Sequence, residues 1–132
     1  MAGYSTVLFD LDGTLIDSTE LIMSSFRHTM RTHLGTIPSE AEWREGFGTP
    51  LRPQLARFAR DAAEVDAMVE TYRVYQRAHH DRLVTVFPGV PHVMAWLRER
   101  QVHLGIVTSK NRAGTLHGLR HCGLAEYFEV VV

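Results

Sequence analysis

Two aspartates separated by a single residue, Asp10 and Asp12, have the type and spacing best suited to chemistry in this sequence. Adjacent carboxylates repel each other, and a divalent cation such as Mg²⁺, which prefers hard oxygen ligands, offsets that repulsion. With the cation in place, one carboxylate can attack phosphorus and form an aspartyl phosphate. The other can protonate the leaving oxygen and later activate water. The pair therefore indicates metal-assisted phosphoryl transfer.

The same residues also have a plain structural interpretation, because Asp and Gly are favoured in turns. Taken alone, Asp-x-Asp-Gly is more typical of a turn or a calcium loop than of catalysis. Here, however, the pair follows an apolar, β-branched run at residues 6–9 that predicts a buried strand. Site chemistry in α/β folds collects just beyond the carboxyl ends of such strands. Gly13 permits a tight turn there and is followed by Thr14.

A second polar segment, Thr108, Ser109 and Lys110, follows the apolar run at residues 102–107. A hydroxyl and a backbone N–H at a helix start can hold a phosphoryl group, since anions are favoured there. Lys110 opposes the helix dipole at this position, which suggests an anion nearby. The alternative, a solvated lysine at a helix start, stays open.

The elements expected around these segments alternate in the way that is typical of a parallel α/β sheet. A strand is followed by a helical segment, and then by helix, strand, helix and strand, with the last strand at residues 128–132. The helical segment should hold four helices without a strand, which indicates a small bundle. One of them begins with capping-box spacing at Ser39 and Glu42. We expect a core of residues 1–16 and 85–132 and a helical domain of residues 17–84.

The composition of the chain limits its partners. Of 132 residues, 45% are hydrophobic and the formal net charge is −1, so no basic field favours nucleic acid or an acidic membrane. No apolar run approaches the roughly 18 residues of a membrane span. The lone cysteine, Cys122, is expected to be a buried small apolar residue, and a single thiol suits a reducing cytoplasm. The composition does not indicate an oligomeric state.

Residues 9–15, Phe-Asp-Leu-Asp-Gly-Thr-Leu, resemble the first signature motif of the haloacid dehalogenase (HAD) superfamily phosphatases. Residues 106–109 resemble the second motif. The resemblance implies an α/β fold, namely a HAD-like Rossmannoid parallel sheet with an inserted α-helical cap. It also implies Mg²⁺ as cofactor. The dehalogenases of the superfamily lack the second aspartate and the metal, so Asp12 sets this chain apart from them.

The resemblance assigns roles by position. Asp10 is expected to be the nucleophile and a metal ligand, and Asp12 the general acid and base, with its backbone carbonyl on the metal. Gly13 and Thr14 are expected to support these two residues. The phosphoryl group should be bound by Thr108, Ser109 and Lys110.

The substrate is implied by similarity within the superfamily. Residues 48–50, Gly-Thr-Pro, resemble the substrate-facing cap loop of the phosphoglycolate-phosphatase-like subgroup, which marks Gly48 and Thr49 as candidates. Residues 14–22, 72–75, 78–81 and 104–110 are similar to the inorganic pyrophosphatases of that subgroup. The implied reaction is hydrolysis of pyrophosphate to two phosphates. The alternatives are phosphoglycolate phosphatase or another small phosphomonoesterase, and a non-catalytic phosphate-binding or interaction module.

Two further features remain at this point. The neighbours His79 and His80 could serve a metal or an anion, but histidines are also favoured near a helix C-terminus. The family has two later motifs, a lysine and an acidic pair, and neither is found before Val132. We therefore expect a truncated copy with three strands, an uncovered first strand and little activity of its own.

Overall fold

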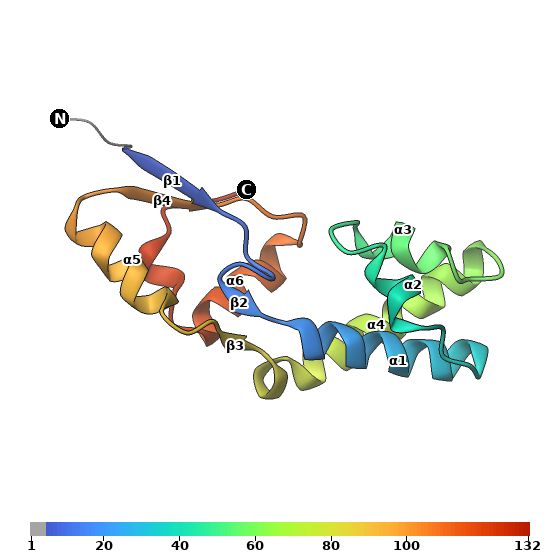
Figure 1. Ribbon diagram of the computed structural model, residues 1–132. Helices are drawn as coiled ribbons and strands as arrows, with labels where there is room; N and C mark the ends of the chain where they lie inside the picture. Colours follow the sequence, from blue (N-terminus) through green and yellow to red (C-terminus); the bar gives the residue numbers. More distant parts are fainter. Residues whose placement is uncertain (1–4) are drawn as a thin grey trace. The chain divides into compact units, whose positions relative to one another are not determined.

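The apolar run near the start of the chain forms strand β1, Thr6–Phe9, in a computed structural model that describes residues 5–132. β1 pairs in parallel with β4, His103–Ile106, and β4 pairs in parallel with β5, Val130–Val131. The order β1-β4-β5 (Figure 1) confirms the predicted parallel α/β arrangement. Phe9 lies opposite Ile106, so the segments that follow the two strands both begin at the carboxyl end of the parallel sheet.

Two helices and a short 3-10 helix connect these strands. Helix α5, Val90–Glu99, precedes β4, and α6, Arg112–His121, leads through η1, Ala125–Tyr127, to β5. Both helices lie on the same side of the sheet in Figure 1. The β4 side chains of Leu104 and Ile106 are buried, and so are Met94 of α5 and Leu119 of α6. One face of the sheet therefore contributes to an apolar core.

The opposite face of the sheet is apolar but open. Leu8, Gly105 and Val130 lie side by side in the register and therefore share a face. Leu8 is 60% exposed, and Val107, Val130 and Val132 are 45%, 53% and 72% exposed. Parallel sheets usually have both faces covered. We call Leu8, Val107, Val130 and Val132 the open sheet face. β1 is an edge strand within the described residues, as the sequence predicts.

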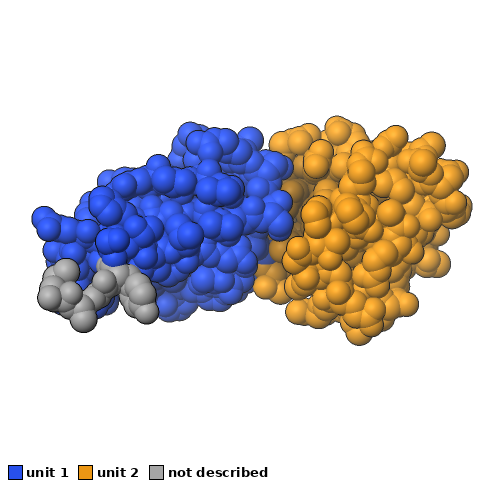
Figure 2. All heavy atoms as spheres, turned by 90° about the horizontal axis from the view of Figure 1, so that it is seen from above, with its two compact units in different colours: residues 1–18, 84–132 blue, residues 19–83 orange. Residues whose placement is uncertain are grey.

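The chain divides into two units (Figure 2). Unit 1 contains the residues up to Ser18 and Val84–Val132, and unit 2 contains Thr19–Leu83. Residues 1–4, which fall within the expected core range, lie outside the described residues. The short strands β2, Ile16–Asp17, and β3, Thr85–Val86, form an antiparallel pair within unit 1. That pairing joins the segment that leaves unit 1 to the segment that returns to it.

Unit 2 consists of four helices, as the sequence predicts. They are α1, Thr19–Leu34; α2, Glu40–Arg44; α3, Leu51–Ala56; and α4, Ala62–Leu83. Their core is aromatic: Phe26 stacks on Trp43 with ring centroids 4.2 Å apart, and both side chains are fully buried. The capping box predicted at Ser39 and Glu42 is present at the start of α2.

No helix in the described part of the chain is long and apolar enough to cross a membrane.

Candidate functional site

A tightly hydrogen-bonded turn follows β1 and carries the aspartate pair. Its anchor is Leu11, which is fully buried and whose carbonyl accepts three backbone N–H groups, those of Thr14, Leu15 and Ile16. Gly13 has φ +80°, a left-handed conformation that strains residues with a side chain, and its N–H donates to the Ile16 carbonyl at 3.0 Å. These hydrogen bonds therefore fix the backbone conformation of the turn that carries both aspartates.

Asp10 and Asp12 have different surroundings in this turn. Asp10 is exposed, and its Oδ1 accepts the N–H of Leu11 at 2.7 Å. Asp12 is partly buried, with 29% of its side chain exposed. Its Oδ1 accepts the Ser18 hydroxyl at 2.8 Å and lies 3.5 Å from Nζ of Lys110. Asp10 is thus open to an incoming group, whereas Asp12 is held by neighbours.

The second polar segment follows β4, at the same carboxyl end of the parallel sheet. The N–H of Thr108 donates to the Val132 carbonyl at 3.3 Å. Oγ1 of Thr108 accepts the N–H of Lys110 at 3.2 Å, so the hydroxyl hydrogen can still be donated. Ser109 is exposed. Asn111 caps α6, because its side chain accepts the N–H of Gly114.

The structure joins the two predicted segments directly. The contact between Lys110 and Asp12 spans 98 positions in the sequence, and only 16% of the Lys110 side chain is exposed.

Thr14 lies in the turn after β1 and borders an apolar hollow of about 250 Å³ in unit 1. Gly48 and Thr49 belong to unit 2, in the turn between α2 and α3, where Gly48 has φ +90°.

Ser18 contacts the aspartate pair although the sequence did not mark it as a candidate site residue. It lies just before α1, and its hydroxyl donates to Asp12. It is 3% exposed. The local sequence carries no periodic signal for this contact, because it depends on the turn that brings residues 12 and 18 together.

The donor set of this turn fits a magnesium ion. A carboxylate of Asp10 and the backbone carbonyl of Asp12 are hard oxygen ligands, which Mg²⁺ prefers. When both aspartates are ionised, their carboxylates and the Lys110 ammonium together leave one net negative charge. A divalent cation and a phosphate dianion would add opposite charges to this group, so the site suits both.

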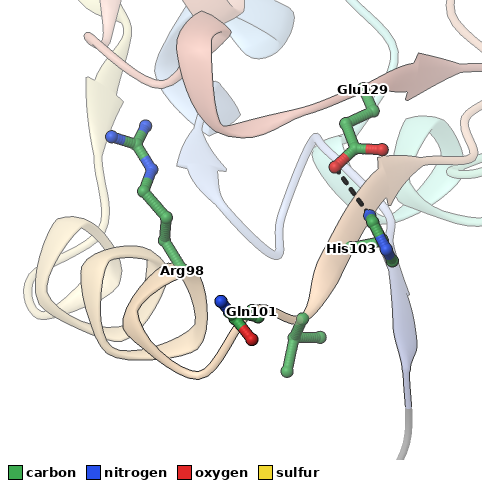
Figure 3. Close-up of a pocket in the computed structure, with 5 residues that line it drawn as sticks. Arg98, Gln101, His103 and Glu129 are labelled. Carbon is green, nitrogen blue, oxygen red and sulfur yellow. Dashed lines mark hydrogen bonds and ion pairs between the residues drawn. The ribbon is translucent and has the colours of Figure 1, made fainter.

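Another hollow of unit 1 lies at the other end of the strands. Its volume is about 490 Å³, and its lining residues are Arg98, Gln101, Val102, His103 and Glu129 (Figure 3). His103 begins β4 and lies opposite Thr6, at the amino ends of the parallel strands. Nδ1 of His103 lies 2.8 Å from a Glu129 carboxylate oxygen. This hollow is thus separate from Asp10 and Asp12.

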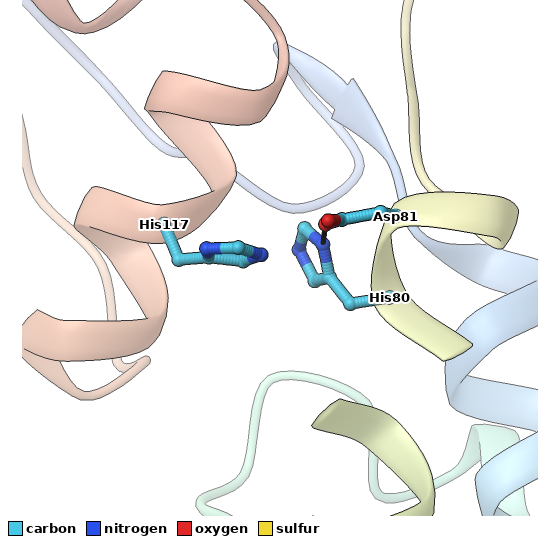
Figure 4. A group of neighbouring side chains, drawn as sticks. All are labelled: His80, Asp81 and His117. Carbon is cyan, nitrogen blue, oxygen red and sulfur yellow. Dashed lines mark hydrogen bonds and ion pairs between the residues drawn. The ribbon is translucent and has the colours of Figure 1, made fainter. Parts of the chain in front are cut away.

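The histidine pair near the end of α4 has different partners. Nδ1 of His80 lies 2.9 Å from Oδ1 of Asp81 (Figure 4), and the side chain of His80 is buried. Nδ1 of His79 lies 2.9 Å from a guanidinium nitrogen of Arg82. The two rings therefore contact different side chains of unit 2.

Comparison with known proteins gives consistent matches. The family model described as haloacid dehalogenase-like hydrolase matches residues 7–132. Pyrophosphatase PpaX of Halalkalibacterium halodurans is 44% identical over 128 residues, which are 97% of this chain and 59% of that protein. The chain therefore spans less than two thirds of the length of this curated relative.

Solved structures match with the same coverage. A predicted phosphatase from Clostridium acetobutylicum has a TM-score of 0.84 and 30% identity, over 99% of this chain and 61% of that one. Protein Tyrosine Kinase A (PtkA) of Mycobacterium tuberculosis has a TM-score of 0.80 and 33% identity, over 98% of this chain and 61% of that one. The fold is therefore shared by proteins with different descriptions.

Proposed function

The chain belongs to the haloacid dehalogenase-like hydrolases, and we propose that it is a magnesium-dependent phosphohydrolase in which Asp10 takes the phosphoryl group. One observation carries this proposal. An exposed aspartate at the end of a parallel strand stands beside a second aspartate that is hydrogen-bonded and paired with a lysine. An exposed carboxylate suits a nucleophile, and a second carboxylate held beside it by neighbouring groups suits proton transfer to and from the reacting oxygens.

The proposed reaction has two steps. An oxygen of Asp10 forms a bond to phosphorus while the bond from phosphorus to the leaving oxygen breaks, and Asp12, which enters this step protonated, gives its proton to that oxygen. Asp12 then takes a proton from a water molecule, whose oxygen attacks phosphorus and releases phosphate from Asp10. The Leu11 N–H, on Oδ1 of Asp10, fixes the direction in which the other carboxylate oxygen points.

Other groups of the site hold the phosphoryl group and the metal. Thr108 can donate its hydroxyl hydrogen, Ser109 its backbone N–H, and Lys110 supplies a positive charge. Mg²⁺ would be held by the Asp10 carboxylate and the Asp12 carbonyl, and it would neutralise negative charge between nucleophile and substrate. Gly13 and Thr14 keep the turn in shape.

Pyrophosphate is the substrate that we propose. The relative that is 44% identical is described as a pyrophosphatase. Unit 1 would carry the chemistry, and unit 2, with Gly48 and Thr49, would act as the cap that selects the substrate. The sequence has a single cysteine and therefore no internal disulfide, which is consistent with a protein of the reducing cytoplasm.

Single-turnover phosphate release tests the proposal, with the chain in excess over the substrate so that slow turnover still gives a signal. Pyrophosphate should be cleaved at least about tenfold faster than 2-phosphoglycolate, which corresponds to about 1.4 kcal/mol of transition-state discrimination. EDTA or Asp10→Asn should abolish the release.

The alternatives predict different results in the same experiment. Faster cleavage of 2-phosphoglycolate than of pyrophosphate would indicate a phosphomonoesterase instead of a pyrophosphatase. Phosphate binding that Asp10→Asn leaves unchanged, together with no release from either substrate, would favour a non-catalytic phosphate-binding module.

A further inference from the structure

One carboxylate oxygen of Asp12 receives both of the side-chain contacts described for this residue. The Ser18 hydroxyl donates to Oδ1 at 2.8 Å, and Nζ of Lys110 lies 3.5 Å from the same atom. The first distance is that of an ordinary hydrogen bond between oxygens, whereas the second is at the outer limit for a nitrogen donor. The hydroxyl of Ser18 is therefore the closer constraint on Asp12.

Backbone pairing fixes both ends of this hydrogen bond. Asp12 forms an isolated bridge with Ile16, and Ile16 and Asp17 pair with β3. Ser18 follows directly and is 3% exposed, so water competes little for its hydroxyl. Serine also has a single side-chain torsion that orients its oxygen, which limits the alternatives open to the donor.

We infer that Ser18 is a positioning residue, which turns Asp12 so that Oδ2 faces the reacting atoms and transfers the proton. This inference rests on the proposed function, because it gives Asp12 the role of general acid. Oδ1 is occupied by the Ser18 hydroxyl and approached by Lys110, so Oδ2 is the oxygen available to the leaving group. Lys110, at 3.5 Å, can move toward a phosphate without releasing the carboxylate from Ser18.

The inference predicts that loss of the hydroxyl affects proton donation more than the attack on phosphorus. Two aryl phosphates separate these effects. 4-Nitrophenyl phosphate has a leaving group that departs as an anion, whereas the leaving oxygen of phenyl phosphate, with a phenol pKa of about 10, needs a proton. A misplaced general acid should therefore slow only the second substrate strongly.

Ser18→Ala and Ser18→Thr are the matched variants for this test, since threonine keeps the hydroxyl. In single-turnover assays, Ser18→Ala should slow phenyl phosphate by about tenfold or more and 4-nitrophenyl phosphate by less than about threefold. Ser18→Thr should restore most of the rate. An equal loss with both substrates, or no loss with either, would overturn the inference.

A thermal double-mutant cycle tests the contact without activity. Ser18→Ala should lower the Tm of the Asp12 chain by roughly 4 °C more than it lowers the Tm of the Asp12→Ala variant. Equal shifts would mean that Ser18 does not hold Asp12. If the unmodified chain cleaves no phosphate ester, the proposed function fails, and the cycle still decides whether the positioning contact exists.

Discussion

At the residue scale, the proposed site contains two aspartates with different surroundings. Asp10 is exposed and accepts one backbone N–H, whereas Asp12 is partly buried and contacts Ser18 and Lys110. Their spacing in the sequence predicted a paired role. It could not predict which oxygen of Asp12 is engaged, because Ser18 and Lys110 reach that oxygen through the turn after β1 and the end of β4.

Removal of the Asp12 carboxylic acid should slow both steps of the proposed reaction. Asp12→Asn keeps the backbone carbonyl but cannot transfer the proton, so phosphate release from pyrophosphate should fall by about 100-fold or more. Rapid-quench measurement of phosphate release gives this rate. Glu70→Gln, on the exposed face of α4, removes the same charge elsewhere and should leave the rate within about twofold. A similar loss in both variants would contradict the role of Asp12.

The thiol of Cys122 should react slowly. Burial raises its pKa, an effect that the positive charge of Lys110 partly offsets. A raised pKa means less thiolate at neutral pH, so reaction with a disulfide reagent should be slower than that of glutathione and should increase as pH rises above 8. The sequence predicted a buried cysteine, but the side chain is only partly buried, at the end of α6.

Lys110→Met provides the control for this thiol. It removes the charge that lowers the pKa of Cys122, so the reaction at pH 8 should become slower still. A Cys122 rate equal to that of glutathione, or a faster rate in Lys110→Met, would contradict the account.

At the element scale, the sequence predicted the helices and the strands of the parallel sheet, while the two-residue strands β2 and β3 escaped. The run at residues 6–9 became β1, and Ser39 begins α2 with the predicted capping box. β2 and β3 have two residues each, too few for a period-two pattern to show. Their pairing depends on tertiary structure, because it joins residues 16–17 to residues 85–86.

The capping box of α2 should be measurable in unfolding. Oγ of Ser39 accepts the N–H of Glu42, and the Glu42 carboxylate accepts the N–H of Ser39. Ser39→Ala should lower the free energy of unfolding in urea by about 0.5–2 kcal/mol. Ser39→Asn is the matched variant, because its side-chain oxygen can still accept the N–H of Glu42, and it should keep most of the stability. Equal losses in the two variants would argue against the side-chain cap.

At the scale of the whole molecule, the open sheet face is an exposed apolar surface. Leu8 on the edge strand β1 is 60% exposed and lies beside Gly105 and Val130. Exposed apolar patches and unpaired edges promote association. The sequence predicted the edge, and the one-sided packing of α5 and α6 adds that a face is open as well.

Leu8→Lys should reduce self-association. Because Leu8 is largely exposed, the free energy of unfolding should change by less than about 1 kcal/mol, while the charge should repel a second chain. Sedimentation velocity over a range of concentrations measures the association. Val74→Lys is a matched control, since Val74 is 50% exposed on α4 of unit 2. An equal effect of both variants would mean that association does not involve the open sheet face.

The central claim is that Asp10 carries the phosphoryl group, and covalent trapping tests it most directly. The chain is mixed with Mg²⁺ and pyrophosphate, quenched in acid, digested and analysed by mass spectrometry. The account predicts one phosphoryl group on the peptide that contains Asp10, removable by hydroxylamine as expected for an acyl phosphate, and absent in Asp10→Asn or with EDTA. A phosphoryl group on another residue, or phosphate release from the Asp10→Asn variant at an unchanged rate, would contradict the account.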